Sequence, residues 1–171
     1  MALYLPLFEA LNNSGTRYVV VGGLATVLHG YARLTADVDI IVDLDPSAAT
    51  NVLQALEDLG LRPRLPVPAK DFADPAKREQ WINEKHMEVF SFLDPKNPMF
   101  AVDVFVRHPI AFDKLYADSK NVDIGGATIR ICSIDHLIEL KHRAGRPQDL
   151  DDIVQLERIK QWQTDETDGP K

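Results

Sequence analysis

Residues 18–44 have the sequence YVVVGGLATVLHGYARLTADVDIIVDL, and this stretch decides the fold. The β-branched and aromatic run at 18–21 predicts a strand. Gly22-Gly23 predicts a turn into a helix over 24–29, because glycine adopts turn conformations without a steric penalty. Apolar residues alternate with aspartates over 37–44, which predicts a second strand with Asp37 and Asp39 on one face. We therefore expect a strand, a turn, a short helix and a second strand.

The paired aspartates indicate a metal site. On a strand, Asp37 and Asp39 lie about 6.6 Å apart, and at an effective dielectric constant of about 20 their charges repel by roughly 2.5 kcal/mol. A divalent cation removes this cost, and ligands that are all oxygens suit Mg²⁺ or Mn²⁺. The alternative is a solvated strand face, which is the interpretation that we favour for Asp43. The preceding glycine turn favours the metal site. It lies at a helix N-terminus, which attracts phosphate groups, and Mg²⁺ commonly binds carboxylates and phosphates together.

The spacing of these residues resembles the signature of the nucleotidyltransferase superfamily typified by DNA polymerase beta. That signature is an apolar residue, Gly-Gly or Gly-Ser, a spacer and Asp-x-Asp, and here Val21-Gly22-Gly23 is separated by thirteen residues from Asp37-Val38-Asp39. With His29-Gly30, Arg33 and Thr35, the stretch is more specifically similar to small bacterial nucleotidyltransferases of the abortive-infection toxin type. The chain lacks the serine of the Gly-Ser version, so a phosphate contact at position 23 would use backbone N–H groups.

Composition limits the class of protein and its partners. The chain has 171 residues, for which we expect one domain over 1–163, with a core over 16–131, C-terminal helices over 133–163 and a flexible polar tail over 164–171. The 19 basic and 26 acidic residues give a net charge of −7, which argues against generic DNA binding. The N-terminal apolar stretch lacks a basic leader, and no stretch is long enough to span a membrane. One cysteine, Cys132, excludes an intrachain disulfide and suits a cytoplasmic protein.

The rest of the chain continues as helices and strands. Helix starts are expected at Asp45-Pro46, Asp74-Pro75, Ser133 and Asp149. Strands are expected over 86–93, 100–106, 121–124 and 127–131, the last two forming a hairpin. A proline-rich segment over 61–72 is expected to be a loop, a position from which it could border a substrate. This order predicts an α/β or α+β domain with a mixed sheet.

Asp103 is the only charged residue in the apolar strand over 100–106. A carboxylate there is costly to bury unless it is hydrogen-bonded or bound to a cation. In the resembled family a third carboxylate comes from a strand beside the Asp-x-Asp strand, and Asp103 matches that position. The alternative is a buried aspartate that caps a neighbouring loop. For Glu88, on the preceding strand, a structural role is preferred.

The run over 141–146, KHRAGR, is the densest basic segment of this acidic chain. The resemblance implies that Lys141 and Arg146 reach the phosphates of a nucleotide. The alternative is that basic residues here complement the C-terminal dipole of the preceding helix. For His142 and Arg143 that alternative is preferred.

The resemblance implies a polymerase-beta-like fold and the transfer of a nucleoside monophosphate from a nucleoside triphosphate to a hydroxyl, with release of pyrophosphate. Two Mg²⁺ or Mn²⁺ ions would be held by Asp37, Asp39 and Asp103, and Asp103 would help to deprotonate the acceptor. The nucleotide would be held by Gly22, Gly23, Arg33, Thr35, Lys141 and Arg146.

The acceptor stays open between a small molecule, a protein side chain and a transfer-RNA end. The resemblance also implies a possible role as the toxin of a toxin–antitoxin pair, with an antitoxin as partner. The alternative from another class is a catalytically inactive nucleotide-binding regulator or an antitoxin-like interaction protein.

Overall fold

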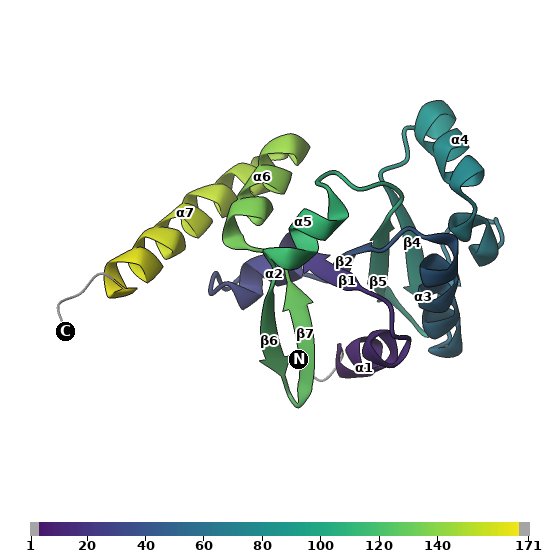
Figure 1. Cartoon of the computed structure of the whole chain (residues 1–171), viewed down its shortest axis with the longest axis horizontal. Coiled ribbons are helices and arrows are strands. Elements are labelled where there is room, and N and C mark those ends of the chain that lie inside the picture. The colour runs from purple at the N-terminus through teal and green to yellow at the C-terminus, as the bar shows by residue number, and fades with distance from the viewer. Residues whose placement is uncertain (1–3, 168–171) are drawn as a thin grey trace.

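The computed structural model describes residues 4–167, which form a seven-stranded mixed sheet with helices around it (Figure 1). The strand order is β3-β4-β5-β2-β1-β7-β6. The strands are β1 (Tyr18–Val21), β2 (Asp37–Val42), β3 (Arg62–Pro63), β4 (Val89–Asp94), β5 (Asn97–Phe105), β6 (Lys120–Ile124) and β7 (Ala127–Ile131). The helices are α1 (Leu5–Asn13), α2 (Gly22–Leu28), α3 (Pro46–Asp58), the 3₁₀ helix η1 (Ala69–Ala73), α4 (Pro75–Lys85), α5 (Phe112–Ala117), α6 (Ile134–Ala144) and α7 (Pro147–Thr167).

The expected mixed α/β architecture is confirmed, and its helices are distributed around the central strands. Helices α6 and α7 lie together at one end of the molecule, and α4 lies at the other (Figure 1). Asp45, Asp74 and Ser133 cap their helices through their side chains, as the sequence predicts. None of the helices in the described part of the chain combines the length and the apolar character needed to cross a bilayer.

Strand β2 lies in the middle of the sheet and brings together the two ends of the sequence signature. It runs antiparallel to β1 and parallel to β5. Its register places Asp39 opposite Val21 on one side and opposite Asp103 on the other. The glycine turn and the third aspartate therefore meet at the same point of the sheet.

The proline-rich segment over 61–72 is not a loop throughout, and that prediction was wrong. Arg62 and Pro63 pair with β4 as a short strand at the edge of the sheet, where the missing N–H of proline costs no ladder hydrogen bond. The buried ring of Phe72 anchors η1 in the core. A proline-rich sequence thus gains structure from its neighbours.

The last helix also differs from its expected bounds. It begins at Pro147, since proline suits the first helical turn, and Asp149 lies within that turn. It continues to Thr167, beyond the expected boundary at residue 163, because the sequence has no glycine or proline until Gly169. Of the tail expected over 164–171, residues 168–171 lie outside the described part.

Gly22 joins β1 to α2 in a conformation that only glycine adopts easily. Its φ is +63°, in the left-handed region. A Cβ atom at this position would lie 2.0 Å from Oδ2 of Asp39. Gly22 therefore serves both the turn and the placement of the Asp39 carboxylate.

We predict that Gly22→Ala destabilises the protein more than Gly125→Ala, its matched control in the β6–β7 hairpin. Gly125 has a φ of +62°, but a Cβ atom added there would have no atom within 4 Å. The control should cost about 1–2 kcal/mol for backbone strain alone. Gly22→Ala should cost about 1–3 kcal/mol more, because the added methyl group overlaps Asp39. Urea unfolding measures both values, and equal losses would contradict the steric role.

Candidate active site

Asp39 and Asp103 are direct neighbours on the parallel strands β2 and β5. Adjacent strands lie about 4.8 Å apart, so the two half-buried side chains share one small volume. Burial, together with the charges of Asp103 and Asp37, raises the pKa of Asp39 to about 6. Burial also raises the pKa of Asp103, against a hydrogen bond from Ser91. Asp37 is exposed at the start of β2, from where its charge acts on both other carboxylates.

A cleft of about 780 Å³ opens beside these two aspartates. This volume lies within the usual range for small-molecule sites. Three carboxylates and three guanidinium groups contribute to its wall, together with apolar side chains of β5 and α6. The lining residues are Asp39, Glu88, Val89, Asp103, Phe105, Arg107, His108, Pro109, Leu140, Arg143, Ala144 and Arg146.

The signature residues before β2 are packed against the second glycine of the turn. A Cβ atom on Gly23 would lie 2.5 Å from Oγ1 of Thr35 and 2.7 Å from Nη2 of Arg33. The Gly23 N–H donates a hydrogen bond to Asp39, which opposes the rise in the pKa of that carboxyl group. The structure thus brings together Gly23, Arg33, Thr35 and Asp39, four residues of the sequence signature.

An ion cluster at the junction of α6 and α7 contains Arg33, Lys141, Arg146, Asp149 and Asp152. Nζ of Lys141 lies 2.6 Å from Oδ2 of Asp152 and 3.4 Å from Oδ1 of Asp149. Nε of Arg146 lies 2.6 Å from Asp149, and Nε of Arg33 lies 3.3 Å from Asp152. Burial raises the pKa of Asp149, but Arg146 and Lys141 outweigh this effect and lower it overall. The cluster has three cations and two carboxylates, which leaves one positive charge in excess.

Lys141 and Arg146, which the sequence groups together, have different environments. Lys141 is 3% exposed and its ammonium group is enclosed by the carboxylates of α7. The side chain of Arg146 is 73% exposed, lines the cleft, and its charge acts on Asp39. The structure therefore brings Arg146 to the candidate site and places Lys141 behind it. The helix-dipole alternative does not describe Lys141 either, because its partners are side chains.

Sequence reasoning missed residues whose roles depend on tertiary contacts. Asp152 is 1% exposed, and its only sequence signal is its spacing of three from Asp149 on a helix with a buried face. Ser91 faces Asp103 across β4 and β5, and its signal is a polar position between two buried phenylalanines. Arg143, for which a helix-end role is preferred from the sequence, contributes to the cleft wall and pairs with Glu139. Glu88 pairs with Arg107, in keeping with a structural role.

The carboxylates at the cleft suit a metal that is shared with a substrate. Within residues 4–167, no three side chains of histidine, cysteine, aspartate or glutamate form a group that would hold a metal ion by itself. Asp39 and Asp103, however, form an adjacent pair of oxygen ligands whose like charges a cation would satisfy. Mg²⁺ is commonly held by one or two carboxylates together with water and substrate phosphates. The donor set fits Mg²⁺ or Mn²⁺ in that mode.

The raised pKa of Asp39 predicts a loss of stability as the pH rises. Because the folded state binds this proton more tightly than the unfolded state, ionisation costs about 3 kcal/mol between about pH 4 and pH 6. With divalent cations removed by a chelator, the unfolding free energy of Asp39→Asn should equal that of the wild type near about pH 4. Above about pH 6 the variant should be the more stable protein. Urea unfolding at both pH values measures the difference.

Asp43→Asn is a control for which we expect the opposite change in unfolding free energy. A hydrogen bond from Arg17 lowers the pKa of Asp43, so its carboxylate stabilises the folded state at neutral pH. Asp43→Asn should therefore lose stability where Asp39→Asn gains it. A fall in stability for both variants at neutral pH would refute the electrostatic cost at Asp39.

The ion cluster predicts a large structural role for Lys141. Lys141→Met leaves Asp149 with Arg146 alone and Asp152 with Arg33 alone, which should cost about 1.5–3 kcal/mol of unfolding free energy, because both buried carboxylates lose a charged hydrogen-bond donor. Lys160→Met is the matched control, since Lys160 of α7 pairs with Asp135 at the surface and should cost less than about 1 kcal/mol. Similar losses for the two variants in urea unfolding would exclude the cluster as a stabilising element.

Solved structures with the same fold include three nucleotidyltransferases or related proteins. The antibiotic-resistance factor ANT(2'')-Ia has a TM-score of 0.57 at 14% identity, over 92% of this chain and 80% of that chain. The lincomycin-bound lincosamide antibiotic adenylyltransferase LnuA has a TM-score of 0.56 at 18% identity, over 92% of this chain and 94% of that chain. An antigenic nucleotidyltransferase-like protein from Paracoccidioides brasiliensis has a TM-score of 0.52 at 17% identity, over 88% of this chain and 71% of that chain. These likenesses establish the polymerase-beta-like nucleotidyltransferase fold.

The family follows from the sequence itself. No curated protein matches the chain. A family model described as "Nucleotidyltransferase of unknown function (DUF6036)" matches residues 7–167, which is most of the chain. The chain therefore belongs to this nucleotidyltransferase family.

Proposed function

We propose that the protein transfers a nucleoside monophosphate from a nucleoside triphosphate to an acceptor hydroxyl and releases pyrophosphate. The observation that carries this proposal is the adjacency of Asp39 and Asp103 at a cleft that Arg146 also lines. Two carboxylates with raised pKa values beside a guanidinium group can hold a cation and a polyphosphate together. The family and the fold support nucleotidyl transfer in general.

The roles of the residues follow from their positions. Asp39 and Asp103, completed by Asp37, would hold Mg²⁺ or Mn²⁺, which when bound neutralises charge on the attacking and leaving oxygens. Asp103 accepts the proton of the acceptor hydroxyl while the hydroxyl oxygen bonds to the α-phosphorus. The bond between the α-phosphorus and the oxygen that bridges it to the β-phosphate breaks, and pyrophosphate leaves with that oxygen. A raised pKa makes Asp103 a better proton acceptor than an ordinary aspartate.

Two cationic side chains, one at the cleft and one at the glycine turn, would bind the phosphates. Arg146 lines the cleft and remains largely exposed, while Arg33 lies against Gly23. Thr35 packs on the same glycine, so it supports the turn around Gly22 and Gly23. Lys141 is assigned to holding Asp149 and Asp152, which in turn contact the two arginines.

For the acceptor, a small molecule with a hydroxyl group is the proposal that the solved structures support. One of them is lincomycin-bound, and another structure of ANT(2'')-Ia contains adenylyl-2''-tobramycin. The cleft of about 780 Å³ has room for a molecule of that class beside a nucleotide phosphate. Transfer to a protein or a transfer-RNA end, and the toxin role with an antitoxin partner, stay predictions from the sequence resemblance, as does a cytoplasmic location.

The test is nucleotide transfer by the purified protein. Triphosphates labelled at the α-phosphate are incubated with Mg²⁺ or Mn²⁺ and a panel of hydroxyl acceptors, and pyrophosphate release is measured. Asp39→Asn should reduce turnover roughly 10²–10³-fold. The change removes a carboxylate ligand of the proposed metal, which would stabilise the charge that develops at the reacting phosphate. Asp43→Asn, a change near the end of the same strand but outside the cleft, should retain turnover.

Two outcomes would overturn the proposal. Equal turnover in wild type and Asp39→Asn would show that the activity does not arise at this site. Tight triphosphate binding without pyrophosphate release for every acceptor would instead support the inactive nucleotide-binding regulator.

A further inference from the structure

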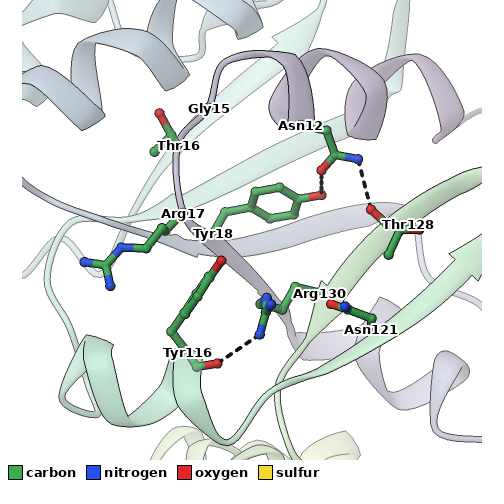
Figure 2. Close-up of a pocket in the computed structure, with 9 residues that line it drawn as sticks. All are labelled: Asn12, Gly15, Thr16, Arg17, Tyr18, Tyr116, Asn121, Thr128 and Arg130. Atoms are coloured by element: carbon green, nitrogen blue, oxygen red, sulfur yellow. Dashed lines mark hydrogen bonds between the residues drawn. The ribbon is translucent and has the colours of Figure 1, made fainter.

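A second, smaller pocket of about 240 Å³ lies at the other end of β1 from the glycine turn (Figure 2). Tyr18, the first residue of β1, lines it, whereas Val21 at the end of β1 pairs with Asp39. Its wall comes from the end of α1, the start of β1, the end of α5 and the β6–β7 hairpin. The pocket shares no lining residue with the cleft.

Arg130 is the cation that this pocket presents. Its guanidinium lies 4.2 Å from the centre of the Tyr116 ring. Its Nη1 donates to the backbone oxygen of Tyr116 at 3.3 Å and to Oγ of Ser119 at 3.1 Å. Within residues 4–167 no carboxylate forms an ion pair with Arg130. The side chain is thus held in place while its charge is not neutralised by a partner.

Arg17 on the opposite side of the pocket has the contrasting arrangement. Its guanidinium binds Asp43 at 2.6 Å and Asp113 at 2.8 Å. The same guanidinium also lies 5.4 Å from the centre of the Tyr116 ring, but its charge is neutralised by these two carboxylates. Arg17 therefore closes the wall, and Arg130 alone supplies a charge for a ligand.

The remaining lining is rich in hydrogen-bond donors and has no acidic side chain. In the described part of the chain, the Tyr116 hydroxyl and the Asn121 amide have no hydrogen-bond partner. Asn12 is already engaged, since it accepts from the Tyr18 hydroxyl at 2.9 Å and donates to the Thr128 backbone at 2.9 Å (Figure 2). The free donors and the unpaired cation thus face a volume that is smaller than most small-molecule sites.

We propose that this pocket binds a small oxyanion, either a phosphate group or a carboxylate, through Arg130, Tyr116 and Asn121. A guanidinium group binds both anions through paired N–H donors, and stacking on Tyr116 orients its plane. The size excludes a whole nucleotide, so the ligand is a small anion or the anionic end of a larger molecule.

The experiment titrates the ¹⁵N-labelled full-length protein with sodium phosphate and, separately, with sodium acetate, each against sodium chloride at equal ionic strength. Saturable shifts of the backbone amides of Asn121 and Thr128 are the expected result with at least one oxyanion. A response to phosphate alone identifies a phosphate group as ligand, and a response to acetate identifies a carboxylate.

Three variants locate the binding. Arg130→Gln should weaken it roughly tenfold or more, because it removes a charge-assisted hydrogen bond. Tyr116→Phe, which keeps the ring under Arg130, should weaken it roughly threefold and serves if Arg130→Gln does not fold. Lys77→Gln, on the exposed face of α4, removes the same charge elsewhere and should leave binding unchanged.

The inference is overturned if neither phosphate nor acetate shifts the backbone amides of Asn121 and Thr128 more than chloride does at equal ionic strength. It is also overturned if the response is confined to Gly22 and Gly23, or if folded Arg130→Gln and Tyr116→Phe both bind as the wild type does.

Discussion

The parallel pairing of β2 with β5 places two carboxylates side by side in the middle of an apolar sheet, and the rest of the site depends on this arrangement. Ionisation of Asp39 alone costs about 3 kcal/mol there. The flanking side chains Val38, Ile40, Val102 and Val104 are fully buried, and each contributes about 1.5–3 kcal/mol to folding. The strands therefore keep their register although the charges repel, and the cation proposed for this site would relieve a repulsion that the fold already tolerates.

The ion cluster at the junction of α6 and α7 connects this sheet to the C-terminal helices. Lys141 joins Asp149 to Asp152, and these carboxylates contact Arg146 in the cleft and Arg33 beside the glycine turn. Buried charges are costly alone but hold a geometry when each has a partner. The basic run of an acidic chain thus has two functions, since one residue organises the helices and another faces Asp39.

Local patterns predicted the parts of the structure that local chemistry controls. Alternation predicted β2, and the glycine pair predicted the turn. The isolated carboxylate in an apolar strand predicted only a hydrogen bond or a bound cation, and its place beside Asp39 was implied by the family resemblance. Lys141 could not be placed in this way, because its partners lie on another helix and are visible only after α6 and α7 pack. The short strand at Pro63 likewise forms only because β4 offers an edge.

The same distinction explains why the chemistry of the site is easier to infer than its acceptor. The carboxylates are positioned by strand register, which is a property of the backbone that proteins of this fold can share at 14–18% identity. The cleft wall is built from side chains of α6 and of the segment after β5, including Leu140, Arg143 and Arg107. These side chains determine shape and charge, and such a low identity carries no information about them. Under the proposed function, acceptor preference therefore depends on a surface that the fold leaves free to vary, whereas the nucleotide chemistry depends on the sheet.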